Sequence, residues 1–130
     1  GDLKSIKLLS KIETNLGVDN FKEIIRYSDG IIIARGDLIP ECGLINSVDK
    51  EFDLLLKVKK YEKEKEVIIA THILDNMRKG IIPNINELES IYTFVNLGVT
   101  GFLLASETSI GNYPVKSVEM LKMLINLYKK

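Results

Sequence analysis

Four short apolar runs, separated by segments with helical spacing, constrain this chain more than any other feature of its sequence. The runs are Ile6 to Leu9, Ile31 to Ala34, Val67 to Ala70 and Phe102 to Leu104. None of them alternates apolar with polar residues, and continuous apolar runs of this length are typical of strands covered on both faces, as in a parallel sheet. The sequence therefore predicts an α/β fold.

The segments between and after these runs have the patterns of helices. Asn84 and Glu87 form a capping-box pattern, and Gly98 is placed to end the helix that this box opens. Pro114 suits the first turn of the last helix. The apolar stripes are Val18, Phe21, Ile24 and Ile25; Val48, Phe52, Leu55 and Val58; Leu88, Ile91, Tyr92 and Val95; and Val115, Val118, Leu121, Leu124 and Tyr128. We expect four βα units in a single domain over residues 1–130.

The composition indicates which binding partners and which cellular compartment to expect for this chain. The chain has 130 residues, with 18 basic and 18 acidic side chains, so it has no charge bias and we expect no nucleic-acid partner. The single cysteine, Cys42, excludes an intramolecular disulfide and fits a reducing, cytoplasmic location. No apolar run approaches the roughly 18 residues of a membrane span, so no membrane association is expected.

Polar residues stand at or just after the ends of the apolar runs. Right-handed crossovers bring the carboxyl ends of parallel strands to one edge of a sheet. The residues expected at that edge are Lys11, Glu13, Asp37, Thr71, His72, Glu107 and Thr108. Their convergence predicts a ligand site at this edge.

The residue types at this edge suit a small anionic substrate. Glu13 and Asp37 offer hard carboxylate oxygens to Mg²⁺ or Mn²⁺. Lys11 lies two residues before Glu13 on an extended strand, where its ammonium can neutralise charge on a substrate oxygen. Gly36 leaves backbone N–H groups open to a bound anion. The set indicates a phosphorylated or carboxylated acid as substrate.

Each of these residues also has a structural explanation. Lys11 can be a solvated lysine at a strand end, Asp37 a turn former, and Glu107 the start of a helix. His72 can protonate an intermediate near neutral pH, or it can be a structural histidine that donates to a backbone carbonyl. The residues alone leave these alternatives open.

Several segments resemble pyruvate kinase in order and approximate spacing. They are Ser10-Lys11-Ile12-Glu13; Ser28 to Leu38, which ends in Ala34-Arg35-Gly36-Asp37-Leu38; Ile69-Ala70-Thr71 with Leu74 and Met77; and Glu107-Thr108 with Gly111 and Tyr113-Pro114. The resemblance runs through essentially the whole chain. It implies strands five to eight of the TIM (β/α)8 barrel of that enzyme. A full barrel takes about 250 residues, so half of one is expected here.

The resemblance implies a role for each matching position. Lys11 would be the catalytic lysine that stabilises phosphoryl transfer, and Glu13 and Asp37 the ligands of Mg²⁺ or Mn²⁺. The substrate-binding residues would be Lys11, Gly36, Asp37 and Thr71, with Arg35, His72 and Glu107 at the pocket rim. In pyruvate kinase these groups help to convert phosphoenolpyruvate and ADP into pyruvate and ATP, a step of glycolysis; K⁺ is expected in the parent protein only.

The chain departs from the family pattern near this pocket. The departures are Ile39, His72, Ile85, Ser90, Ala105 and Ser106. We therefore expect a fragment of a divergent pyruvate kinase with little or no activity alone, which forms a homo-oligomer or depends on the missing barrel half. Two alternatives are a degenerate, non-catalytic half-barrel that binds a partner or a small carboxylic acid, and a metal-dependent enolate lyase or aldolase.

Overall fold

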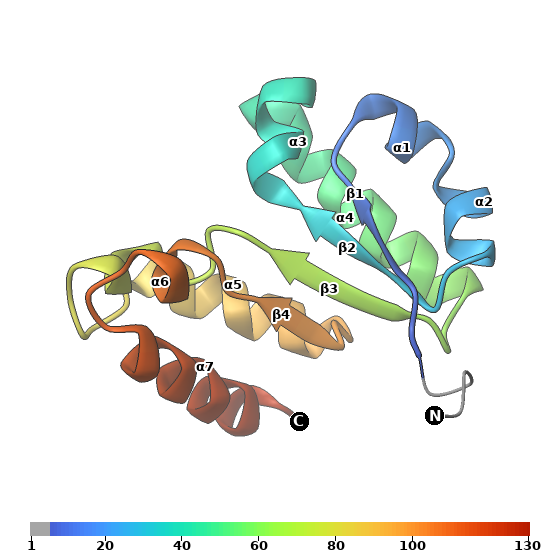
Figure 1. Cartoon of the computed structure of the whole chain (residues 1–130). Coiled ribbons are helices and arrows are strands. Elements are labelled where there is room, and N and C mark those ends of the chain that lie inside the picture. The colour runs from blue at the N-terminus through green and yellow to red at the C-terminus, as the bar shows by residue number, and fades with distance from the viewer. Residues whose placement is uncertain (1–5) are drawn as a thin grey trace. The chain divides into compact units, whose positions relative to one another are not determined.

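The computed structural model describes residues 6–130 and confirms an α/β fold in which strands and helices alternate along the chain (Figure 1). The strands are β1 (Leu9–Ile12), β2 (Gly30–Ala34), β3 (Glu66–Ala70) and β4 (Gly101–Leu103). The helices are α1 (Asn15–Asp19), α2 (Phe21–Arg26), α3 (Arg35–Cys42), α4 (Leu44–Tyr61), α5 (Ile85–Asn96), α6 (Ser106–Ser109) and α7 (Pro114–Tyr128), with a 3₁₀ helix, η2, at Asp75–Arg78. The chain divides into two compact units, Gly1–Ile69 and Ala70–Lys130. Within residues 6–130, no helix combines the length and the apolar character needed to cross a membrane.

The sheet of the first unit places β1, β2 and β3 side by side in that order. β1 and β2 run parallel, with Leu9 opposite Gly30 and Ile12 opposite Ile33. Gly30 allows β2 to begin very close to β3, because a Cβ at this position would lie 2.4 Å from the carbonyl oxygen of Glu66. The absence of a side chain at Gly30 is therefore required by the backbone that passes beside it.

The first strand lies three residues later than the apolar run predicts. The prediction was Ile6 to Leu9, whereas β1 covers Leu9–Ile12. Ile6 and Leu8 are 68% and 58% exposed, and Ile12 is fully buried. Pairing with β2 decides the position of β1, so Lys11 lies inside the strand rather than after it.

Two short helices follow β1, and their apolar residues agree with the predicted stripe. The Thr14 side chain caps α1 by accepting a hydrogen bond of 3.0 Å from the Gly17 N–H. Asn20 separates α1 from α2, and Phe21 and Ile25 of α2 are buried. These residues cover the first unit's core beside the sheet.

The buried face of α4 differs from the predicted stripe. The predicted residues were Val48, Phe52, Leu55 and Val58, but Val48 is 51% exposed. The residues that α4 buries are Ser47, Glu51, Leu54, Leu55 and Val58. The helix is therefore rotated about its own axis, by about one residue, relative to the predicted buried face. This rotation brings an acid, Glu51, into the interior.

The second unit confirms the predicted helix boundaries. The Asn84 side chain accepts from the Glu87 N–H and the Glu87 side chain accepts from the Asn84 N–H, both at 2.9 Å. Gly98 follows α5 with a φ of 93°, and Pro114 is the first residue of α7. The helices α5 and α7 pack together, with the Tyr92 and Tyr128 rings edge to face at 5.3 Å.

Candidate functional site

Lys11 and Glu13 stand together at the carboxyl end of β1. The Lys11 Nζ lies 3.6 Å from Glu13 Oε2, and the two side chains are 49% and 38% exposed. Ile12 between them is fully buried, as the alternation of a strand requires. Strand geometry thus puts the ammonium and the carboxylate on the same open side, where a ligand can reach both.

The segment Arg35-Gly36-Asp37-Leu38 begins a helix directly after β2. The helix α3 covers Arg35–Cys42, so Ile39, one of the departures from the family pattern, is helical. Leu38 is fully buried and anchors the helix, while Asp37 is exposed in its first turn. The amino end of a helix carries partial positive charge, so an anion is favoured beside this turn.

The parallel register relates these two segments. Ile12 lies opposite Ile33, so Glu13 leaves β1 at the level where Ala34 ends β2. Adjacent strands lie about 4.8 Å apart. The two acids therefore emerge from the carboxyl ends of neighbouring strands, with Asp37 one helical turn beyond its strand.

The helix α4 buries an acid, Glu51, that pairs with Arg35 at the start of α3. Glu51 is 5% exposed, and its Oε1 lies 3.6 Å from Arg35 Nε without a hydrogen bond from any described residue. Burial raises the pKa of Glu51 from 4.5 to about 7, and the Arg35 guanidinium only partly offsets this rise. Glu51 was not among the residues predicted for a site, because the apolar pattern of α4 indicated a buried face of apolar residues alone.

Thr71 and His72 follow β3 and belong to the second unit. Both have left-handed backbone conformations, with φ values of 67° and 55°. The Thr71 hydroxyl donates to the Ala70 carbonyl at 2.6 Å. The His72 Nδ1 lies 2.6 Å from Asp75 Oδ2, so a side-chain carboxylate is one partner of this ring.

Glu107, expected at the rim of the pocket, is fully buried in the second unit. Its Oε2 accepts a hydrogen bond of 2.7 Å from the Leu74 N–H, and its Oε1 accepts one of 3.1 Å from the Ala105 N–H. The carboxyl group therefore joins the segment after β3 to the start of α6.

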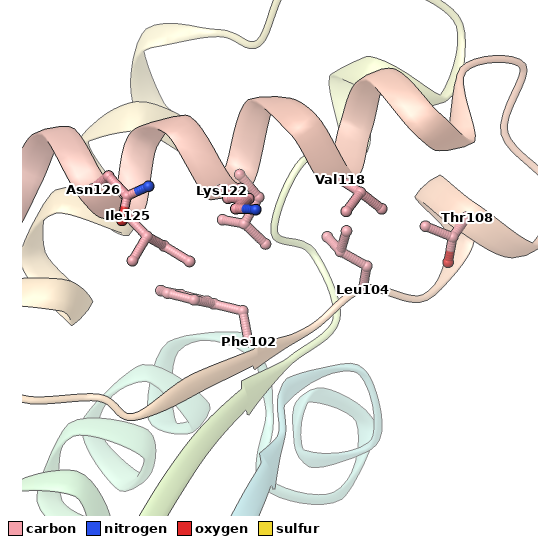
Figure 2. A pocket seen from close by; sticks show the side chains of 8 residues that line it. Phe102, Leu104, Thr108, Val118, Lys122, Ile125 and Asn126 are labelled. Atoms are coloured by element: carbon pink, nitrogen blue, oxygen red, sulfur yellow. The ribbon is translucent and has the colours of Figure 1, made fainter.

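An apolar groove of about 370 Å³ lies between β4 and α7 of the second unit (Figure 2). Phe102 and Leu104 line one side, and Val118 and Ile125 line the other. Thr108, one of the residues expected at the strand ends, also lines this groove, whereas Lys11, Glu13 and Asp37 do not. Its apolar walls do not suit a phosphorylated acid, so the polar strand ends remain the candidate site.

The possible metal ligands at the strand ends are few. Among residues 6–130, no three His, Cys, Asp or Glu side chains are grouped closely enough to hold a metal ion. Glu13 and Asp37 provide two hard oxygen donors, and Mg²⁺ is usually bound by one or two carboxylates together with water and substrate oxygens. The donor set therefore fits a metal whose remaining ligands come from substrate and solvent.

Fold and site together define the class of this protein. Its βα units carry acids and a lysine at the carboxyl ends of neighbouring parallel strands, the place where such folds bind small anionic substrates. Residues 1–118 match the family model described as pyruvate kinase, barrel domain. The chain belongs to the pyruvate kinase family.

Individual relatives agree with this assignment. The chain is 38% identical to the pyruvate kinase of Thermotoga maritima over 91% of its own length and 25% of the relative. It is 37% identical to that of Aeropyrum pernix, over 98% of this chain and 28% of the relative. The crystal structure of pyruvate kinase from Pyrobaculum aerophilum matches with a TM-score of 0.86 and 31% identity, over 93% of this chain and 28% of that one. The chain thus spans about a quarter of the length of these relatives.

Proposed function

We propose that this chain is the part of a pyruvate kinase barrel that holds the divalent metal and the carboxylate of phosphoenolpyruvate. The observation that carries this proposal is the register of β1 against β2, which brings Glu13 and the start of α3 to the same edge of the sheet. By resemblance, the four strands correspond to strands five to eight of the barrel, and residues 1–130 act as one catalytic-domain segment.

The residues at this edge of the sheet have different roles in phosphoryl transfer. Lys11 places its ammonium beside the transferring phosphoryl group and neutralises charge on its oxygens. The N–H groups of Gly36 and Asp37, in the first turn of α3, bind the substrate carboxylate. Glu13 and Asp37 hold Mg²⁺ or Mn²⁺. When bound, that metal neutralises negative charge on the substrate and orients its oxygens.

Further roles extend the proposal to the second unit and the parent protein. By resemblance, Thr71 is a substrate-binding residue through its hydroxyl, and Arg35 and His72 are rim residues of the complete barrel. ADP and K⁺ are bound by parts of the parent that this chain lacks. The isolated chain consequently has little or no turnover, and it either pairs with the rest of the barrel or forms a homo-oligomer.

Binding of oxalate, which imitates the enolate of pyruvate, tests this function without requiring turnover. We expect calorimetric titration to show oxalate binding only when Mn²⁺ is present. Asp37→Asn should weaken that binding more than about tenfold, because the metal loses a carboxylate ligand. Asp49→Asn, which changes an exposed acid on α4, is the matched control and should bind like the unmodified chain.

Two outcomes would contradict this proposal. If Asp37→Asn and Asp49→Asn bind oxalate equally and without metal, Asp37 is not part of the binding site. No binding of oxalate or Mn²⁺ would favour the non-catalytic half-barrel. A coupled assay of pyruvate formation tests whether the chain is active alone. Robust turnover by the 130-residue chain would contradict the proposal that its activity depends on the rest of the parent protein.

A further inference from the structure

The backbone that follows β3 is held in a conformation that its residues disfavour. Thr71 and His72 are consecutive left-handed residues, and they are the only non-glycine residues with positive φ among those described. This region is especially unfavourable for a β-branched side chain such as that of threonine. Contacts elsewhere in the second unit must therefore fix this turn.

Glu107 supplies the first of these contacts from outside the turn. Its carboxyl group is fully buried, and its two oxygens accept separately from the Leu74 N–H at 2.7 Å and the Ala105 N–H at 3.1 Å. Leu74 itself is fully buried, and Ile73 is 2% exposed. The segment after His72 is thus fixed both by a short hydrogen bond to a carboxyl oxygen and by apolar burial.

Glu87 supplies a second contact on the same segment. Its Oε2 accepts from the Asn76 N–H at 2.9 Å, while its Oε1 takes part in the capping box at Asn84. Two residues that lie on different helices, α6 and α5, therefore bind N–H groups two positions apart at the beginning of η2. The end of η2 is held as well, since the Asn112 N–H donates to the Arg78 carbonyl at 2.8 Å.

We propose that Glu107 is a positioning residue that keeps Thr71 in its left-handed conformation, so that the Thr71 hydroxyl stays in place for substrate. This role of Glu107 rests on the proposed function, in which Thr71 is a substrate-binding residue. Glu107 does not touch the substrate, because it is fully buried and acts through the backbone of the 71–78 segment. Glu87 reinforces the same segment from α5.

The substitution Glu107→Gln tests whether Glu107 positions the backbone through its hydrogen bonds or only fills space in the interior. Glutamine has nearly the same shape, but its NH₂ group cannot accept a hydrogen bond, whereas both Glu107 oxygens accept one. One of the two N–H groups must then lose its partner. We expect amide exchange at Leu74 or Ala105 to accelerate at least about tenfold, with Ile31 and Ile33 in β2 unchanged.

Oxalate binding in the presence of Mn²⁺ is the second readout, because it tests whether the hydrogen bonds of Glu107 affect the substrate site. Glu107→Gln should weaken this binding about tenfold, whereas Glu119→Gln, an exposed glutamate on α7, should leave both readouts unchanged. If the Glu107→Gln variant binds oxalate as tightly as the unmodified chain although one amide has lost its partner, Glu107 has only a structural role. Uniformly faster exchange over the whole chain would also overturn a local role.

The unmodified chain offers a test that does not depend on the variant folding. The Leu74 amide should exchange about 100-fold more slowly than the amide of an exposed residue such as Asn86, although Leu74 lies in no strand or α-helix. Rapid exchange at Leu74 would refute the contact. If the chain binds no oxalate at all, the proposed function fails, while exchange at Leu74 still decides whether Glu107 holds the turn.

Discussion

Replacing Glu51 with glutamine should stabilise the first unit above neutral pH. In the folded chain burial raises the pKa of Glu51 to about 7, compared with 4.5 for an exposed glutamate. Between these two pH values the folded state retains a proton that the unfolded chain has released. The free energy of unfolding must therefore fall as the pH rises through this range, because folding then requires the uptake of a proton.

The magnitude follows from the size of the pKa change. A rise from 4.5 to about 7 corresponds to about 3 kcal/mol of lost stability once the pH exceeds 7. The attraction between Glu51 and Arg35 is already contained in this net value, since it lowers the pKa against the larger effect of burial. Glu51→Gln keeps the shape of the side chain and removes the charge, so this pH-dependent loss should disappear.

Urea denaturation followed by helical circular dichroism measures the effect at a series of pH values from 4 to 8.5. The variant and the unmodified chain should have similar stability near pH 4.5 and should diverge as the pH rises, with the variant more stable by up to about 3 kcal/mol. Asp53→Asn is the control, because Asp53 is an exposed acid on the same helix, 2.8 Å from Lys57. Parallel stability curves for Glu51→Gln and the unmodified chain would refute the buried-acid reasoning.

Two further substitutions test the packing and capping of the two units. Gly30→Ala should destabilise the chain by about 2 kcal/mol, measured as a lower urea midpoint, because the new Cβ would lie 2.4 Å from the Glu66 carbonyl oxygen. An unchanged midpoint would show that β2 and β3 can separate without cost. Asn84→Ala should lower stability by about 1 kcal/mol and accelerate amide exchange at Glu87, which loses its cap at 2.9 Å. Unaltered exchange at Glu87 would mean that the capping box does not hold α5.

The sequence predicted the helix ends better than the first strand. Asn84, Gly98 and Pro114 act through local backbone chemistry, so their roles could be recognised from a few neighbouring residues. The position of β1 depends on pairing with a strand about 20 residues further along the chain. An apolar run cannot reveal that pairing, and the prediction consequently chose Ile6 to Leu9.

Buried acids were the main feature that the sequence did not reveal. Glu51 sits among apolar positions of α4 and contacts Arg35, and Glu107 binds the backbone of a segment far away in sequence. Both contacts are tertiary, so helical periodicity carries no signal for them. The strand-end motifs of Lys11, Glu13 and Asp37 were recognisable because adjacent residues define them, and their joint role in metal and substrate binding stays a prediction.

The direct passage from β2 into α3 has a consequence for how this part of the protein can change. Ala34 is the last residue of the strand and Arg35 the first of the helix, so no spacer separates them. Inserting one residue there would rotate the helix by about 100° and swing Leu38 out of the interior. The length of this turn should therefore be constrained during evolution, because an insertion or a deletion would displace the buried Leu38.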